Sequence, residues 1–136
     1  MSRSAETLCV PPERVALVWP HVEGFLGAAC ARSGDWTLEA LRGALDRVEM
    51  LLWVLWDGEA FRAAAVTEVM IVPRGKICRI VVCGGRRATS WPHALAPIEA
   101  YARELGCTAM RVDGRRGWQR VLDNYAMQWI TLEKRL

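Results

Sequence analysis

Residue types that build catalytic and metal sites are scarce in this sequence. There are two histidines, His21 and His93, and neither belongs to a cluster with the spacing of metal ligands. The five cysteines are an odd number and include no CxxC pair, so they indicate neither a disulfide framework nor a zinc site. No Ser-His-Asp or Cys-His arrangement stands out, apart from Cys83 beside Gly84 and near His93. We therefore expect no metal centre, and we interpret Cys83 as a buried structural cysteine.

Long apolar runs are also missing. No run approaches the roughly 18 consecutive apolar residues of a membrane-spanning helix. Residues 1–7 lack the apolar core of a signal peptide. The cysteines fit small buried side chains in a reducing compartment. We therefore expect no membrane association and a cytoplasmic protein, either of the producing cell or of a virus growing in it.

The chain carries only a small excess of positive charge. The formal net charge is +3, and the arginines are spread along the chain. Nucleic-acid binding is better supported by a clustered basic face. Two pairs, Arg86-Arg87 and Arg115-Arg116, would form such a face only if they converge in space. A nucleic-acid-binding module is therefore the least favoured function.

Tryptophan, in contrast, is abundant. The seven tryptophans are spread over nearly every predicted element: Trp19, Trp36, Trp53, Trp56, Trp91, Trp118 and Trp129. Trp53 and Trp56 are three residues apart and point to opposite faces of a strand, which does not favour a one-faced stacking platform for bases. We assign most of them to the core and to the cover of a sheet. Exposed members would suggest a protein partner, because Trp is enriched in interface hot spots.

The length and the 52% of hydrophobic residues fit one domain over residues 1–136. Apolar periodicity and turn signals predict the order β-α-α-β-β-β-α-β-α-β. The predicted elements are strand Thr7–Val10, a helix with its stripe from Val15 to Ala29, a helix from Leu38 to near Val48, strands Leu51–Trp56, Phe61–Val72 and Lys76–Cys83, helix Trp91–Leu105, strand Thr108–Val112, helix Trp118–Tyr125 and a closing strand Trp129–Leu136. This is an α+β protein of α/β character, with a mixed central sheet and helices on both faces.

Two local features leave alternatives. Asp35 or Thr37 caps the second helix. Pro97 is uncomfortable inside a helix because it removes a hydrogen bond and clashes with the preceding turn. Either the regular helix starts near Ala94 or it kinks at Pro97. Gly106 fits the left-handed position after the end of that helix.

The stretch from Lys76 to Gly106 organises the chain. It reads as an apolar strand, a break at Gly84 and Gly85, a basic loop and a helix. A strand, a glycine-containing turn and a helix in this order can aim free backbone amides at an anion. Whether this turn binds a phosphate decides most of what the chain can do.

The order of elements resembles the GCN5-related N-acetyltransferase (GNAT) family over nearly the whole chain, from Thr7 to Leu136. Ala100–Cys107 is similar to the family's "A…LGC" helix end before its fifth strand, and Trp118–Tyr125 stands where the family has its last helix. More narrowly, the texture resembles short acetyltransferase-like proteins of phages and prophages. The residues that carry this texture are Leu52-Trp53-Val54, Asp57-Gly58, Thr67-Glu68, Pro73, Gly84-Gly85, Trp91, Gly114-Arg115, Gly117-Trp118 and Leu122.

The resemblance implies an acetyl-CoA site at the end of the Lys76–Cys83 strand. The residues that would hold the coenzyme are Val81, Val82 and Cys83 along the pantetheine arm, and Gly84, Gly85, Arg86 and Arg87 at the pyrophosphate. The family's loop reads Arg/Gln-x-x-Gly-x-Gly/Ala, because the backbone must approach the phosphates closely. Here Arg86 is present, but Thr89 and Trp91 occupy the two small-residue positions. An indole there obstructs a diphosphate, although Gly84 and Gly85 offer a shifted substitute.

The resemblance also implies the acceptor side of a transferase. Glu68 stands where some members place a general base, and a buried carboxylate there can act through a water. The alternative is a strand glutamate that faces solvent or pairs with an arginine. The tyrosine that protonates the leaving thiolate in the family corresponds to Val121-Leu122 here, and Tyr125 lies a turn later.

Two functions therefore stay open. One is a non-catalytic GNAT-fold module of phage type, a virion or accessory component that binds a phage or host protein. The other is an acetyl-CoA-dependent N-acetyltransferase with an atypical pyrophosphate loop. The missing glycines, the missing acid and the surplus of tryptophan favour the first.

Overall fold

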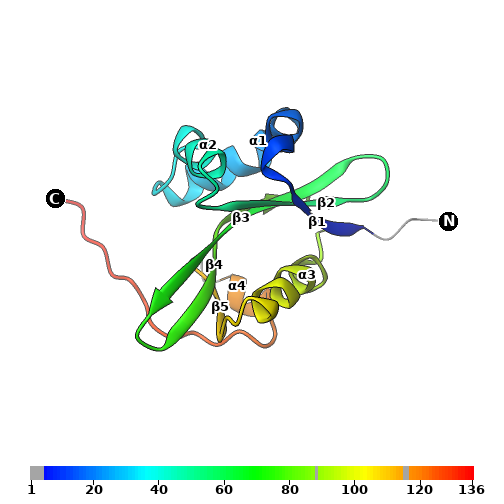
Figure 1. Ribbon diagram of the computed structural model, residues 1–136. Helices are drawn as coiled ribbons and strands as arrows, with labels where there is room; N and C mark the ends of the chain where they lie inside the picture. The colour runs from blue at the N-terminus through cyan, green and yellow to red at the C-terminus, as the bar shows by residue number, and fades with distance from the viewer. Residues whose placement is uncertain (1–4, 88, 115–116) are drawn as a thin grey trace.

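The computed structural model describes residues 5–87, 89–114 and 117–136. Within these ranges, five strands and four α-helices build an α+β fold (Figure 1). Their bounds are β1 (Glu6–Val10), α1 (Val15–Ser33), α2 (Leu38–Asp46), β2 (Leu51–Trp56), β3 (Phe61–Val72), β4 (Gly75–Gly85), α3 (Trp91–Glu104), β5 (Ala109–Val112) and α4 (Trp118–Val121), with a 3-10 turn at Pro12–Arg14 before α1. The predicted fold class is confirmed. No helix among the described residues is both long and apolar enough to span a membrane.

The five strands lie in one sheet in the order β1-β2-β3-β4-β5. All neighbours are antiparallel except β4 and β5, which run parallel. The parallel pair is short, because it begins at Ile77 opposite Ala109 and ends at Ile80 opposite Val112. β4 continues for five residues beyond that point, and this leaves the end of the sheet open on the β5 side.

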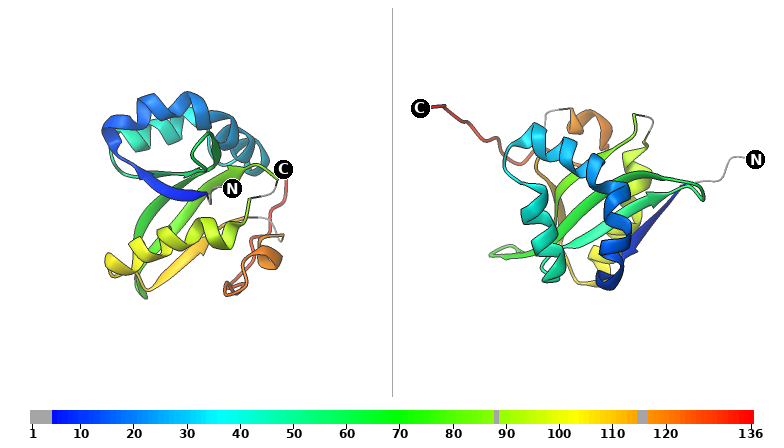
Figure 2. Two further views of the ribbon diagram at one scale, coloured as in Figure 1. Left: turned by 90° about the vertical axis from the view of Figure 1, so that its right-hand side faces the viewer. Right: turned by 90° about the horizontal axis from the view of Figure 1, so that it is seen from above.

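Helices cover both faces of the sheet, as predicted. Helices α1 and α2 lie on one face, and α3 and α4 lie on the other (Figures 1 and 2). Alternation along β2 serves both layers, because Val54 packs into the α1 side and Trp53 into the α3 side. The buried indole of Trp53 donates from Nε1 to Thr67 Oγ1 at 3.0 Å, which satisfies the one buried polar side chain of β3.

The helix ends follow the expected chemistry. Thr37, and not Asp35, caps α2, since its Oγ1 accepts from Ala40 N at 3.1 Å. Gly106 has φ 82°, which suits the left-handed turn after α3. Helix α3 begins at Trp91 and contains Pro97, so the alternative start near Ala94 is wrong.

Two predictions at the far end of the chain are also wrong. The last helix ends at Val121 and not at Tyr125, because Leu122 adopts an extended backbone. The segment of residues 126–136 contains no strand, so the closing strand Trp129–Leu136 is not formed. Strand preference reflects packing against neighbouring strands rather than the backbone alone. Adjacent Trp129 and Ile130 also break the alternation that one buried face requires.

Candidate functional site

The candidate site is the edge where β4 outruns β5. Val81, Val82 and Cys83 occupy this stretch. Val82 and Cys83 pair with Val66 and Ala65 of β3, Val81 is the extra residue at a bulge, and the stretch has no strand partner on the β5 side among the described residues. Val81 and Val82 both pack toward α1, because a bulge opposite Val66 and Thr67 shifts the register there. This stretch of β4 therefore forms a strand edge that is unpaired within the described part of the chain.

Gly84 and Gly85 end β4, and the chain's own atoms crowd both positions. A Cβ on Gly84 would lie 2.4 Å from the carbonyl oxygen of Phe25 in α1. A Cβ on Gly85 would lie 2.6 Å from Cβ of Ala63 and 3.0 Å from Oγ1 of Thr89. Glycine at these positions thus lets α1 and the following loop pack closely on the sheet.

The loop after β4 is tied back to the sheet. Arg86 N donates to Arg62 O at 2.9 Å, and Thr89 donates to Arg86 O from both N (3.0 Å) and Oγ1 (2.7 Å). The side chains of Arg86 and Arg87 are exposed and form no ion pair with the described residues. The loop therefore leaves two cations free beside the start of α3.

The first turn of α3 faces this loop. Ser90 precedes the helix without a side-chain cap, so its first amides receive no hydrogen bond from that residue. Pro92 contributes no N–H, which leaves Trp91 and His93 as the first-turn donors. Such a helix start favours an anion. The predicted strand, turn and helix are thus present in the right order.

Two indoles meet at the same edge. The rings of Trp91 in α3 and Trp118 in α4 lie 5.3 Å apart at an interplanar angle of 71°. Trp118 also covers Gly114, where a Cβ would come within 2.4 Å of the indole. The two helices follow the parallel strands β4 and β5 in the chain, and both indoles pack against one apolar cluster that includes Ile80.

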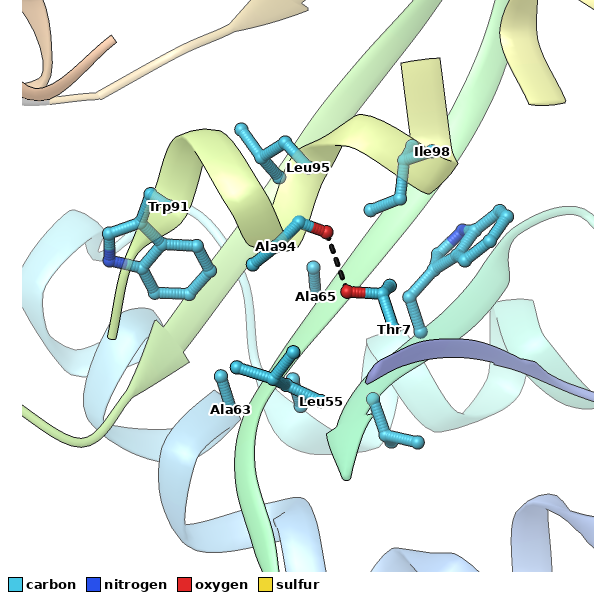
Figure 3. Close-up of a pocket in the computed structure, with 11 residues that line it drawn as sticks. Thr7, Leu55, Ala63, Ala65, Trp91, Ala94, Leu95 and Ile98 are labelled. Atoms are coloured by element: carbon cyan, nitrogen blue, oxygen red, sulfur yellow. Dashed lines mark hydrogen bonds between the residues drawn. The ribbon is translucent and has the colours of Figure 1, made fainter. Parts of the chain in front are cut away.

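Figure 3 shows Trp91 at one end of a small cavity between α3 and the sheet. The cavity measures about 10 Å³, which is the space of a single water molecule. Ala63, Ala65 and Ile98 line it, and the Thr7 hydroxyl donates to Ala94 O across it at 2.7 Å (Figure 3). The interior between α3 and the sheet beside Trp91 is therefore tightly packed.

Glu68 lies on β3 directly opposite Arg79 of β4, after the register shift between Val66 and Thr67. Its carboxylate forms an ion pair with Arg79, in which Oε1 lies 2.5 Å from Nη2, and Arg79 Nη1 also lies 3.3 Å from Asp113 Oδ2. The arrangement is the arginine pairing named above as the alternative to a general base.

The sequence analysis did not identify Arg79 as the partner of Glu68, although the register of the hairpin indicates this pair. The register of β3 and β4 pairs Val72 with Gly75. Counting back from that turn, one residue at a time on each strand, brings Glu68 opposite Arg79. A hairpin register fixed by a short turn thus predicts this ion pair from sequence.

Among the described residues, neither Tyr125 nor Cys83 is a free acid that could protonate a leaving thiolate at this edge. Tyr125 donates its hydroxyl to Glu99 Oε2 at 2.7 Å, and burial together with this hydrogen bond raises the pKa of the phenol. Burial raises the pKa of the Cys83 thiol to about 12, so Cys83 is no nucleophile at neutral pH. No group of three or more potential metal ligands occurs within the described ranges. Arg115 and Arg116 lie outside the described residues.

No family model matches the chain, and no curated protein sequence matches it. Solved structures do. A GNAT family acetyltransferase from Staphylococcus aureus is 16% identical, with 100% of each chain covered and a TM-score of 0.65. A ribosomal-protein-alanine N-acetyltransferase from Brucella melitensis is 12% identical, with 98% of this chain and 99% of that chain covered and a TM-score of 0.67. An aminoglycoside acetyltransferase from an uncultured soil metagenomic sample is 12% identical, with 98% and 97% covered and a TM-score of 0.69.

Identities this low establish the fold alone. The mixed sheet and its helices match the GNAT acetyltransferases over nearly the full length of each compared chain. The predicted resemblance to the GNAT fold is therefore confirmed. Which groups this chain binds depends on the edge between β4 and β5.

Proposed function

We propose that this chain uses the GNAT fold as a non-catalytic binding or assembly module. The observation that carries the proposal is the indole pair of Trp91 and Trp118, which packs together with Cys83 beside the end of β4, where the family's coenzyme would enter. Trp91 stands at a position where the family's loop has glycine or alanine. An indole fixed there by a second indole excludes a diphosphate by its volume.

The acceptor side supports the same proposal. Glu68 is held by Arg79, and Tyr125 is engaged by Glu99 on α3. Proton removal from an amine and proton delivery to a thiolate both need a free group within reach of the reacting atoms. Neither residue offers one in this arrangement.

A protein partner, from a phage or its host, is the proposed ligand. Trp19 and Trp53 are buried and most other indoles are half-buried, so Trp129, at 59% exposure, is the indole offered to a partner. We assign the phage type from sequence texture, such as Leu52-Trp53-Val54 and Gly117-Trp118. On this proposal the protein acts in the cytoplasm or in a virion.

Calorimetric titration with acetyl-CoA and with CoA tests the closed edge. We expect no heat at millimolar ligand. Micromolar binding, about −8 kcal/mol, would overturn the proposal of a degenerate coenzyme site. Stoichiometric association with a larger phage or cellular protein, weakened by Trp129→Ser, is the expected positive result.

A gain-of-binding variant sharpens this test. Thr89→Gly combined with Trp91→Ala restores the small residues of the family's loop, so the double variant should bind CoA more tightly than the parent. Adding Arg86→Ala should remove the gain, since that guanidinium would contact the phosphates. Trp56→Ala, which deletes a half-buried indole of β2, is the control for indole loss. Thermal unfolding of each variant verifies that it is folded.

The second candidate is an acetyl-CoA-dependent N-acetyltransferase with an atypical loop. The unpaired edge of Val81–Gly85 and the free guanidinium groups of Arg86 and Arg87 favour it. On this alternative, Arg86→Ala loses coenzyme affinity and Glu68→Gln loses activity in a thiol-release assay with amine acceptors. Unchanged kinetics in both variants would remove those two assignments.

A further inference from the structure

The sheet has an open edge at β5. This strand pairs with β4 on one side, and its other side has no strand partner among the described residues. Thr108 N donates to Lys76 O at the start of the parallel pair, and every second residue of a strand turns its backbone toward the same neighbour. Ala109 and Arg111 therefore turn their N–H and C=O groups outward. Open backbone groups of this kind accept a further strand.

A groove of about 1100 Å³ runs along this edge. Residues of β5 form one wall, and residues of α3, of α4 and of the segment 124–131 form the others. After α4 the chain passes beside β5 and then leaves the body of the molecule (Figure 1). Pockets for drug-sized ligands measure about 300–1,000 Å³. The groove therefore has room for several residues of an extended peptide.

The two faces of β5 differ in chemistry. Met110 and Val112 pack into the apolar cluster beneath α3. Ala109 and Arg111 point to the opposite face of the sheet, where Arg111 lies opposite Arg79 of β4. A strand added to β5 would therefore place every second side chain beside apolar groups and the side chains between them beside a cationic face.

Two guanidinium groups on that cationic face share one indole. The ring centroid of Trp129 lies 4.7 Å from the guanidinium of Arg111 and 5.9 Å from that of Arg74. Neither guanidinium forms an ion pair with a carboxylate in the described ranges. Asp113 of the same edge is already engaged, because its Oδ2 accepts from Arg79 at 3.3 Å. Two like charges held beside one ring favour an anion that contacts both.

The other carboxylates that line the groove belong to different elements. Glu99 of α3 accepts a hydrogen bond from the Tyr125 hydroxyl on the apolar side of β5. Asp35 lies in the loop between α1 and α2 and forms no ion pair with Arg74 or Arg111. An occupant of the groove must therefore supply the carboxylates for the two arginines itself.

We propose that the groove binds an extended acidic peptide of a protein partner, which adds to β5 as a strand. Its backbone pairs with Ala109 and Arg111, and its carboxylates contact Arg74 and Arg111. Its alternate side chains are apolar and lie beside Met110 and Val112. A nucleic acid supplies negative charge but no backbone N–H and C=O groups for the open edge, so a peptide fits better. The inference rests on the proposed function, because it states the chemistry of the protein partner.

Fluorescence anisotropy with a labelled synthetic peptide tests the charge requirement. The probe alternates aspartate with valine, and the same peptide with lysine in place of aspartate is its control. We expect micromolar binding of the acidic peptide and no binding of the basic one. Equal binding of the two peptides, or no binding of the acidic one, would overturn the proposal.

A matched pair of double variants locates the site. Arg74→Ala with Arg111→Ala should weaken binding of the acidic peptide by about tenfold or more, because two charge-assisted contacts are lost. Arg14→Ala with Arg32→Ala removes the same charge from exposed positions that do not line the groove, and should change the affinity by less than about twofold. Equal losses in both variants would refute this location. Thermal unfolding verifies that each variant is folded.

Backbone methylation of the peptide tests strand addition separately from charge. Only every second N–H of a strand faces a given neighbour. Two acidic peptides are therefore compared, each N-methylated on one of the two alternating sets of residues. We expect one methylated peptide to lose binding and the other to keep it. Unchanged binding of both would show that the peptide does not pair with β5.

Other occupants of the groove are outcomes of the same measurements. An oligothymidylate that displaces the peptide at equal concentration would assign the groove to nucleic acid and overturn the proposal. A dimer in sedimentation equilibrium that does not bind the peptide would assign the edge to a second copy, with the same consequence. A chain that binds neither CoA nor the peptide overturns this inference alone, whereas CoA binding overturns the proposed coenzyme-free module and leaves the peptide result unaffected.

Discussion

Replacement of Gly84 by alanine tests which role that glycine has. Alanine would place its Cβ 2.4 Å from Phe25 O and 3.1 Å from Phe25 C. An ordinary contact needs about 1 Å more than the shorter distance, and the obstacle is helix backbone that cannot rotate away. Helix α1 must therefore withdraw from the sheet, which loosens Val22 and Leu26, both fully buried.

The expected loss follows from this geometry. Overpacking costs about 1–3 kcal/mol, and a backbone obstacle points to the upper end. For a domain of this size, about 3 kcal/mol lowers the melting temperature by roughly 10 °C. Thermal unfolding followed by circular dichroism measures it.

The same helix supplies the control. A Cβ on Gly24 would meet nothing within 4 Å beyond its own helix backbone, so Gly24→Ala should raise stability by about 0.5–1 kcal/mol through helix propensity alone. A Gly84→Ala variant that melts within about 1 °C of the parent would refute the packing argument. If the parent binds CoA in the calorimetric titration, a Gly84→Ala variant with unchanged melting and no CoA binding would instead assign Gly84 to the phosphates.

Three further outcomes are expected. Two backbone amides lower the pKa of Asp57 from 3.8 to about 2. Its contribution to folding stability is therefore complete above the unfolded pKa of about 4 and is lost as the pH falls toward 2. Urea unfolding midpoints measured from pH 5 to pH 2 should fall more steeply for the parent than for Asp57→Asn. Thr67→Val leaves the buried Trp53 Nε1 without its acceptor and should cost about 1–3 kcal/mol in urea unfolding, and Trp53→Phe in the same chain should recover part of that loss. Thr37→Ala should cost about 1 kcal/mol by loss of the α2 cap, whereas Ser90→Ala, which removes no side-chain cap, should leave the urea midpoint nearly unchanged.

Much of the fold was predictable because local rules and tertiary packing agree. The alternating and helical apolar patterns gave β1 to β5 and α1 to α3 nearly at their observed bounds. The order of elements was enough to indicate the GNAT fold, which the structural neighbours confirm. Strong periodicity over long segments leaves few alternative folds.

The segment after Leu122 shows where sequence reasoning stops. Trp129 to Leu132 has the residues of a strand, yet a strand exists only where an edge accepts it. The sequence alone does not show which strand edge is left unpaired. That depends on how far β5 extends and on where α4 ends.

The candidate site divides in the same way. The sequence by itself determined the strand, the glycine pair, the basic loop and the helix from Trp91, because turn and helix signals are local. The pairing of Glu68 with Arg79 also follows from a local signal, the short turn that sets the register of β3 and β4. Only the tertiary structure decided that Gly84 lies against α1 and that Trp91 contacts Trp118. Those two contacts join residues 59 and 27 positions apart, and their distances depend on packing that no local pattern encodes.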